Sequence, residues 1–466
     1  MKPALSLLAF VPAAAYLALC LIFGGASRPT PWPPAWFGYT GLVLVLILAF
    51  PCFALRRSSE AISGPFLVLL HFAALAVLQL IPLPAELWSA LPVRDRLLQG
   101  FDLLGAPPPD RLPPTLSPEA TFEGLLRMFP AMAMLLLLVP VTRRSGILRL
   151  VWFIVIAGTA ASVAGLLQLA APELALPDIH QLGPPHTASG LFANQNHQAT
   201  FLLVCMPMAA ALASFHSNAR QEGDANAGRR LVLLAAILLL AAGVWATGSR
   251  AGLALLLPVM ILCFPVWRGR RGPHAGRAGL LIVLSTVVIG AAALLNSSRL
   301  PVPALADMTL SQDGRERIWQ QSVDILRDNW ITGTGSGTFS SAYALYEDPS
   351  FVTGVYVNHA HNEYLQIAVE MGLTGCLLMA VTLLVWSIAS IRIWTQPDDG
   401  CRSLRRAASV SVLVILLHSL VDYPARTPAL LVLGAALVFI QFFRPEKAPA
   451  ANLPPETRKK ARGVVL

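Results

Sequence analysis

Residues 36–55 read WFGYTGLVLVLILAFPCFAL, a run of twenty residues without a charged side chain. An α-helix of this length spans the hydrocarbon core of a bilayer. Apolar blocks of similar length recur along the whole chain, which indicates a polytopic membrane protein. We predict about twelve membrane-spanning helices, at residues 4–24, 36–55, 64–82, 122–141, 147–170, 196–215, 231–247, 252–267, 278–296, 363–386, 407–421 and 427–443.

The composition excludes several classes of protein. Of the 466 residues, 55% are hydrophobic and 13% are charged, whereas soluble domains carry about 25% charged residues. A soluble enzyme, a secreted disulfide-rich module and a disordered chain are therefore excluded. We expect an all-α fold with a single transmembrane domain at residues 1–443. The six cysteines lie in apolar blocks or predicted cytoplasmic loops, so we expect neither a disulfide nor a metal site.

The basic residues predict how the chain is oriented in the membrane. Most of the 34 lysine and arginine residues fall in alternate short connections, which is the pattern of cytoplasmic loops. Both termini are then cytoplasmic, and the Pro-, Ala- and Lys/Arg-rich segment 444–466 is predicted to be a disordered tail. Because the net charge of +9 is spread over these loops, we expect contacts with membrane lipids and no nucleic-acid partner.

Two predicted outer connections are too long to be simple turns, at residues 83–121 and 297–362. The second lies between the ninth and tenth predicted helices and contains large apolar residues at helical spacing, Trp319, Val323, Leu326 and Trp330. This spacing predicts an amphipathic helix that lies on the membrane surface or covers a cavity. The glycine-rich residues 333–337 that follow fit either a phosphate-binding nest or a flexible turn.

Arginines at the outer ends of the predicted helices are candidate site residues, because charges near the membrane are costly unless they are paired or used. Arg250 lies in the short break TGSRAG, residues 247–252, between the seventh and eighth predicted helices. Its guanidinium can grip a phosphate with a planar fork of donors. The alternative is an interfacial arginine that reaches toward lipid headgroups.

Arg315 and Arg317 lie at the predicted start of the amphipathic helix, where Asp313 and Glu316 resemble a capping box. A helix N-terminus favours anions through its free N–H groups, and the two arginines add full positive charge. The alternative is a solvated helix face that carries Arg–Glu pairs.

A pair of histidines precedes the tenth predicted helix in HAHNEY, residues 359–364. Histidines two residues apart do not share a helix face, and no nearby cysteine or carboxylate cluster completes a zinc site. At the mouth of a pocket, His361 suits work as a general base or a charged contact to phosphate. Asn362 and Glu363 are candidates to orient it, and a structural histidine is the alternative.

Two further polar clusters lie at the outer ends of predicted helices. His418, Asp422 and Arg426 fall between the eleventh and twelfth helices, where an Asp422–Arg426 ion pair is the favoured interpretation. Asn194 and Asn196 open the sixth helix, where their amides bind sugar hydroxyls or cap the helix.

The predicted topology brings these separate positions to one side of the membrane. Arg250, Arg315, His361 and Arg426 are far apart in the sequence, yet all fall on the outer face, against the bias of basic residues toward the cytoplasm. Such an outward-facing basic pocket indicates an anionic ligand that is reached from the membrane. A lipid-linked phosphate or diphosphate fits best.

Over roughly residues 185–385, the chain resembles the O-antigen ligase superfamily, which also contains O-antigen and exopolysaccharide polymerases. The resemblance rests on short motifs in the same order, GLFANQNH (190–197), TGSRAG (247–252), Arg315 four residues before Trp319, NWITGTG (329–335), AHNEYL (360–365) and EMGLTG (370–375). The sequence departs from the family pattern at Asn194-Gln-Asn196, often Asn-Arg-Asn, and at Ser249-Arg-Ala251, often Ser-Arg-Gly.

The resemblance implies a bacterial inner-membrane glycosyltransferase that acts at the periplasmic face without a cofactor or metal. The donor would be a glycan on undecaprenyl diphosphate. The acceptor would be the lipid A core in a ligase, which we expect here, or a lipid-linked glycan in a polymerase, which is the alternative. The resemblance assigns diphosphate binding to Arg250 and Arg315, with Arg317 beside them, and catalysis to His361. The mechanism we expect is a single inverting displacement at the anomeric carbon.

The remaining polar residues of the outer face are then candidate glycan or acceptor contacts, namely Asn194, Asn196, Asn362, Glu363, His418, Asp422 and Arg426. A membrane transporter is the competing class of function. Transporters place polar breaks near the middle of the bilayer, whereas the polar groups here gather at one face, together with the largest loop. An enzyme is therefore favoured over a transporter.

Overall fold

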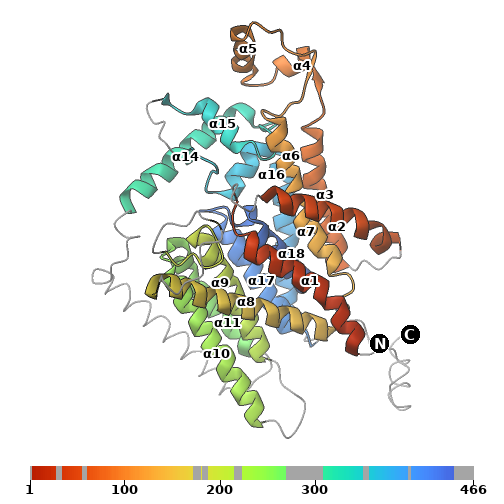
Figure 1. Ribbon diagram of the computed structural model, residues 1–466, viewed down its shortest axis with the longest axis vertical. Helices are drawn as coiled ribbons and strands as arrows, with labels where there is room; N and C mark the ends of the chain where they lie inside the picture. The colour runs from red at the N-terminus through yellow and green to blue at the C-terminus, as the bar shows by residue number, and fades with distance from the viewer. Residues whose placement is uncertain are drawn as a thin grey trace.

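The computed structural model is almost entirely helical (Figure 1). It describes residues 3–27, 34–54, 60–171, 180, 187–214, 223–268, 308–349, 356–396 and 400–444. The helices of the first half of the chain are α1 (Pro3–Phe23), α2 (Pro34–Ala54), α3 (Glu60–Leu78), α4 (Ala85–Ser89), α5 (Arg94–Leu103), α6 (Pro118–Leu126), α7 (Phe129–Leu137), α8 (Arg144–Ala170) and α9 (Gln195–Ser214). Those of the second half are α10 (Gly223–Ala246), α11 (Arg250–Arg268), α14 (Met308–Asn329), α15 (Phe339–Tyr346), α16 (Glu363–Thr395), α17 (Arg402–His418), the 3-10 turn η3 (Pro424–Arg426) and α18 (Pro428–Phe442).

Several of these helices are suited to cross a membrane, so the prediction of a helical multi-pass membrane protein is confirmed. In the described part of the chain, eight segments are long and apolar enough, at 34–52, 61–78, 118–137, 144–170, 195–214, 227–246, 250–267 and 363–395. Shorter apolar helices cover 10–23 and 428–442. The predicted span at 278–296 lies outside the described residues, and the total of twelve stays a prediction.

The predicted helix at 122–141 is broken into α6 and α7, with Arg127 and Met128 between them. The cause is Pro130, which lies in the first turn of α7. Proline lacks the N–H of a helix interior, and its ring clashes with the carbonyl four residues earlier, which favours a kink or a break in the helix at this point. The break leaves Arg127 at a bend inside an otherwise apolar segment.

Helix α9 is the centre of the bundle. Of its 20 residues, 17 are buried, and it packs against α8, α10, α11 and α17. A helix that is apolar on all sides is buried by its neighbours on all sides. The N-terminus of α9 is therefore held in the middle of one end of the bundle.

Several helix termini meet at this end, which we call the site end. The N–H of Ala193, just before α9, donates to Gly25 O after α1 at 3.2 Å, and the N–H of Ala429 in α18 donates to Gly24 O at 3.0 Å. The N–H of Glu363 at the start of α16 donates to Ser419 O after α17 at 2.9 Å. The site end thus joins the last residues of α1 and α17 to the first residues of α9, α16 and α18.

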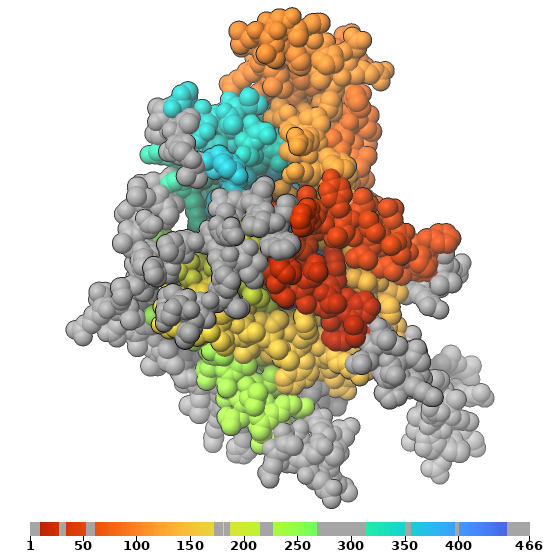
Figure 2. Space-filling model, viewed as in Figure 1, coloured from red at the N-terminus to blue at the C-terminus, as the bar shows by residue number. Residues whose placement is uncertain are grey.

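The predicted outer connection 83–121 carries a small folded insertion. Strand β1 (Leu83–Pro84) pairs antiparallel with β2 (Arg111–Leu112), and α4 and α5 lie between the two strands. The indole N–H of buried Trp88 donates to Pro113 O at 3.0 Å. Figures 1 and 2 show this insertion standing off from the bundle, at the opposite end from α10.

The predicted amphipathic helix is α14, and it packs on the site end through part of its apolar stripe. Ile325 joins a small apolar cluster with residues of α15 and α16, and the Trp319 indole N–H donates to Ala360 O at 2.9 Å. Val323 and Trp330, which belong to the same predicted stripe, are exposed. These contacts pack α14 on α15 and α16, and both expected roles, on the membrane surface or over a cavity, stay predictions.

The expected start of this helix is wrong. Helix α14 begins at Met308, so Asp313 lies inside the helix and is not its N-cap. The same shift moves Arg315 and Arg317 into the helix interior. Their backbone N–H groups are therefore used by the helix and do not form the anion-binding terminus expected from the sequence.

Candidate active site

The centre of the site end is a histidine–carboxylate pair. His361 Nδ1 lies 3.3 Å from Asp422 Oδ1, and the two side chains are 24% and 1% exposed. His361 has a φ of 50°, a left-handed conformation that is uncommon for residues other than glycine. The next residue fixes this turn, because the Asn362 side chain accepts a hydrogen bond from the Leu365 N–H at 3.0 Å and caps α16.

Asp422 is a carboxylate throughout the neutral range. Burial alone raises its pKa, but the interaction with His361 and the charges of His197, His361 and His418 outweigh burial and hold the pKa well below its usual range. A buried carboxylate beside an imidazole fixes the ring orientation and stabilises its protonated form. Asp422 thus makes the contact with His361 that we expected from Asn362 or Glu363.

Further histidines gather around Tyr423. Its ring centroid lies 4.1 Å from that of His359, 4.9 Å from that of His361 and 5.1 Å from that of His197. His418 belongs to the same region, since its Nδ1 lies 2.8 Å from the Thr200 hydroxyl of α9. His197, His359 and Tyr423 were not predicted as site residues. The motifs that contain them are visible in the sequence, but their meeting depends on how α9, α16 and α17 pack.

Only one histidine of the HAHNEY motif is accessible. His359 is 4% exposed, and its Nδ1 lies 3.2 Å from Gln366 Nε2. Burial, followed by the positive charges of Arg426 and Arg127, lowers the pKa of His359 well below its usual range. His359 is therefore neutral at physiological pH, and His361 is the residue of this pair that is placed to meet a ligand.

Among the predicted arginines, Arg315 lies close enough to His418 for its charge to act on that histidine. Arg315 is half-buried on α14. Arg317 is exposed and lies two residues further along the helix, a rotation of about 200°. The two side chains therefore point to different faces of α14, and the structure does not bring Arg317 to the same cluster.

Arg250 lies at the site end on the α9 side. It is the first residue of α11 and is exposed. The preceding turn is fixed by Ser249, whose Oγ accepts a hydrogen bond from the Gly252 N–H at 3.1 Å. A Cβ on Gly252 would lie 2.7 Å from Ala199 Cβ, so the start of α11 packs directly on the first turns of α9.

The two asparagines at the start of α9 lie next to this contact. Asn194 Oδ1 accepts a hydrogen bond from the Asn196 N–H at 2.8 Å, which supports the capping role for Asn194. The Asn196 carbonyl accepts from the Thr200 hydroxyl at 2.9 Å. These bonds connect the start of α9 to His418 through Thr200.

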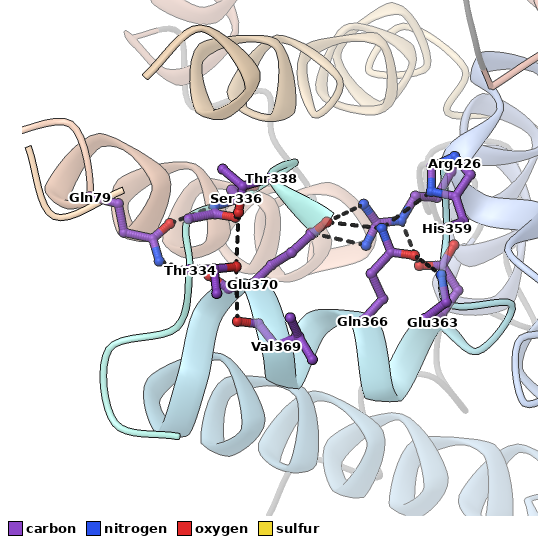
Figure 3. A network of polar contacts seen from close by, with 12 residues as sticks. Gln79, Thr334, Ser336, Thr338, His359, Glu363, Gln366, Val369, Glu370 and Arg426 are labelled. Atoms are coloured by element: carbon purple, nitrogen blue, oxygen red, sulfur yellow. Dashed lines mark hydrogen bonds and ion pairs between the residues drawn. The ribbon is translucent and has the colours of Figure 1, made fainter. Parts of the chain in front are cut away.

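The expected Asp422–Arg426 ion pair is wrong. Arg426 Nε lies 3.0 Å from Glu363 Oε2, and its two terminal nitrogens lie 3.2 and 3.1 Å from the carboxylate oxygens of Glu370 (Figure 3). The two glutamates are two helical turns apart on one face of α16, which presents both carboxylates to one guanidinium. Burial lowers the pKa of Arg426, but these carboxylates outweigh it and raise the pKa above its usual value. Arg426 is thus a paired residue and does not add free positive charge to the pocket.

The glycine-rich segment 333–337 is neither a phosphate nest nor a flexible turn. The N–H groups of Thr334 and Gly335 donate to Val369 O and Glu370 O, both at 2.9 Å. The Ser336 N–H donates to Gln79 Oε1 at 2.9 Å (Figure 3). Gly335 has a φ of 116°, and a Cβ there would lie 2.0 Å from Thr115 Oγ1. The segment is therefore a packed turn that braces the first part of α16 against α3 and α6.

The arrangement is suited to acid–base chemistry on a ligand that carries an anionic group. It offers an accessible imidazole oriented by a permanent carboxylate, with Arg315 beside the same group of histidines. Within the described ranges, no three His, Cys, Asp or Glu side chains are arranged to hold a metal ion.

Comparison with known proteins agrees with these features. Residues 234–380 match the family model described as O-antigen ligase. The matched segment contains Arg250, Arg315 and His361, whereas Asp422 lies outside it. No curated protein matched the chain. The match covers residues 234–380, about a third of the chain, and supports the resemblance to the O-antigen ligase superfamily, a family of membrane glycosyltransferase-like ligases.

Proposed function

We propose that the protein is a membrane glycosyltransferase of the O-antigen ligase type. It transfers a glycan from undecaprenyl diphosphate to a hydroxyl of the lipid A core, at the periplasmic face of the bacterial inner membrane. The observation that carries this proposal is the His361–Asp422 pair, with a contact of 3.3 Å, together with Arg315, whose positive charge acts on His418 at the same end of the bundle. A base and a nearby cation are what transfer from a diphosphate to a hydroxyl requires.

In the proposed reaction, His361 is the general base. Its Nδ1 faces Asp422, so Nδ1 carries the hydrogen and Nε2 keeps the lone pair that accepts the proton of the acceptor hydroxyl. The acceptor oxygen then forms a bond to the anomeric carbon as the bond from that carbon to the diphosphate oxygen breaks. The configuration at this carbon inverts, because a single displacement occurs.

The arginines act on the leaving group. Arg315 and Arg250 stabilise the negative charge that grows on the departing undecaprenyl diphosphate, an electrostatic contribution of about 3–4 kcal/mol per well-placed donor. The diphosphate is already an activated leaving group, so the reaction as proposed needs no metal. Asp422 stabilises the protonated imidazole until the proton is released.

An in vitro transfer assay tests this function and separates it from its alternatives. The purified protein is given a glycan on undecaprenyl diphosphate, with lipid A core or with no second acceptor. Glycan on the core supports the ligase. Longer lipid-linked chains without core would identify a polymerase, which uses the same chemistry on a lipid-linked acceptor. An intact donor in both reactions would contradict the enzyme and favour a transporter.

A further inference from the structure

A second pocket lies beside the active site, between α3, α6, α16 and α18. Its volume is about 190 Å³, and we call it the α3–α16 pocket. Its walls are apolar side chains of predicted membrane-spanning helices, Leu69, Phe72, Ile367, Met371 and Leu431. Four of these five are only half-buried, so the side chains that line the pocket also reach the surface of the bundle.

One lining residue of the pocket has a buried carboxylate oxygen without a hydrogen-bond donor among the described residues. Glu363 lines the pocket and is 7% exposed. Arg426 binds Glu363 Oε2, but none of the described residues donates a hydrogen bond to the buried Oε1. A buried acceptor without a donor is costly. Glu363 Oε1 is therefore suited to accept a hydrogen bond from a ligand that enters the pocket.

Arg127 places a second polar group in the same apolar surroundings. It lies at the break between α6 and α7, lines the pocket, and is 27% exposed, with Glu123 Oε2 at 3.8 Å. Ionisable side chains inside membrane-spanning segments are costly and are usually functional. The Arg127 guanidinium can donate hydrogen bonds to oxygen atoms of a bound head group.

The charges of this pocket do not suit a diphosphate. Its two arginines, Arg127 and Arg426, are balanced by three carboxylates, those of Glu123, Glu363 and Glu370. Without net positive charge, and with a carboxylate oxygen that lacks a hydrogen-bond donor, the pocket disfavours a diphosphate group at this position. A neutral hydroxyl, in contrast, donates a hydrogen bond to a carboxylate.

The His361–Asp422 pair lies between this pocket and the two arginines, Arg250 and Arg315, that are proposed to bind the diphosphate donor. Arg250 and Arg315 lie near α9 and His418, whereas the pocket lies among α3, α6, α16 and α18. His361 precedes α16 and Asp422 follows α17, so their contact lies where these two groups of helices meet. Glu363 is two residues after His361 in the sequence.

We propose that the α3–α16 pocket binds the acceptor, a lipid-anchored molecule whose head carries a sugar hydroxyl, an inference that rests on the proposed function. The lipid anchor lies against the apolar walls. Glu363 Oε1 accepts a hydrogen bond from a hydroxyl of the head group, and Arg127 donates to one of its oxygens. The acceptor and the diphosphate donor thus reach His361 from different sides of the bundle.

A pair of tryptophan variants on α3 tests the pocket without relying on activity. Leu69→Trp fills the pocket, whereas Leu70→Trp adds the same ring at the next position, which is 44% exposed and does not line the pocket. The protein in lipid nanodiscs is labelled with a photoreactive lipid that has a neutral sugar head. We expect labelling of α3 and α16 peptides, at least a tenfold loss in Leu69→Trp, and no loss in Leu70→Trp.

Competition identifies the kind of head group. Excess undecaprenyl diphosphate should leave this labelling unchanged. Displacement of the label by the diphosphate, or equal labelling of the two tryptophan variants, would overturn the assignment.

Acceptor kinetics complete the test. Glu363→Gln removes the charge that accepts the proposed hydrogen bond, so the acceptor KM should rise about tenfold or more while the donor KM stays within twofold. A rise in the donor KM alone would contradict the assignment. If the wild-type protein transfers no glycan but the pocket labels as expected, the proposed function fails and the lipid site stands. If transfer occurs without pocket labelling, the proposed function stands and the assignment of the pocket fails.

Discussion

Replacing Asp422 by asparagine should slow glycan transfer without unfolding the protein. Asparagine keeps the size of the side chain but removes the negative charge that faces His361 Nδ1 at 3.3 Å. It also offers an NH₂ donor, which allows the imidazole to adopt the tautomer that has no lone pair at Nε2. The growing positive charge on the ring then lacks its partner in the transition state.

The magnitude follows from the type of contact. When His361 becomes protonated in the transition state, a charge-assisted hydrogen bond to Asp422 contributes about 1.5–3 kcal/mol, and the wrong tautomer adds to the loss. We therefore expect kcat to fall about 30–150-fold, which corresponds to about 2–3 kcal/mol. The donor and acceptor KM values should change little, because Asp422 is 1% exposed and touches the base and not the substrate.

The assay is transfer from undecaprenyl-diphosphate glycan to the acceptor by purified protein, with the amount of folded protein measured in parallel. Asp324→Asn is a matched control, since Asp324 on α14 is an exposed carboxylate paired with Arg327 at 2.9 Å. The control should keep wild-type activity. If Asp422→Asn keeps kcat within threefold of wild type, the orienting role of Asp422 is refuted.

Three further predictions concern charge. Arg315→Ala should lower kcat at least 100-fold, since one well-placed donor contributes about 3–4 kcal/mol. Arg327→Ala on the same helix is the control and should have no effect. Equal kcat values of the two variants in the transfer assay would refute the role of Arg315. Arg426→Gln should destabilise the protein by about 3–5 kcal/mol, because it leaves the buried carboxylates of Glu363 and Glu370 unpaired. An unchanged melting temperature in detergent would contradict this pairing of Arg426 with the two glutamates. The pKa of His359 is lower in the folded than in the unfolded protein, so the unfolded state binds more protons and stability falls as the pH drops below about 6.5. His359→Asn should therefore lose less thermal stability than the wild type between pH 7.5 and 5. An equal loss in the two proteins would contradict the neutral, buried state of His359.

The sequence predicted the helical membrane architecture and the family that residues 234–380 match, because both depend on local patterns. Apolar blocks of bilayer length predict spans such as 36–55 and 147–170 without knowledge of their neighbours. The boundaries were less accurate where a single residue competes with the pattern. Pro130 divides one predicted span into α6 and α7, and α14 begins before the residues that resembled its cap.

The pairing of charged side chains was not predictable in the same way. Asp422 and Arg426 are close in the sequence, which favoured an ion pair between them. In the structure, Arg426 instead meets two carboxylates that α16 presents on one face, and Asp422 meets a histidine 61 positions earlier in the chain. Such contacts depend on the packing of α16 against α17 and η3, about which a single sequence contains no local signal.

The role of His361 can be measured most directly by transfer from undecaprenyl-diphosphate glycan with the wild-type protein and His361→Ala, alongside donor binding by both. A general base contributes a factor of about 10²–10⁴, so we predict that the variant binds the donor like wild type but transfers glycan at least 100-fold more slowly. Transfer at a wild-type rate by His361→Ala would contradict the central claim that this histidine activates the acceptor hydroxyl.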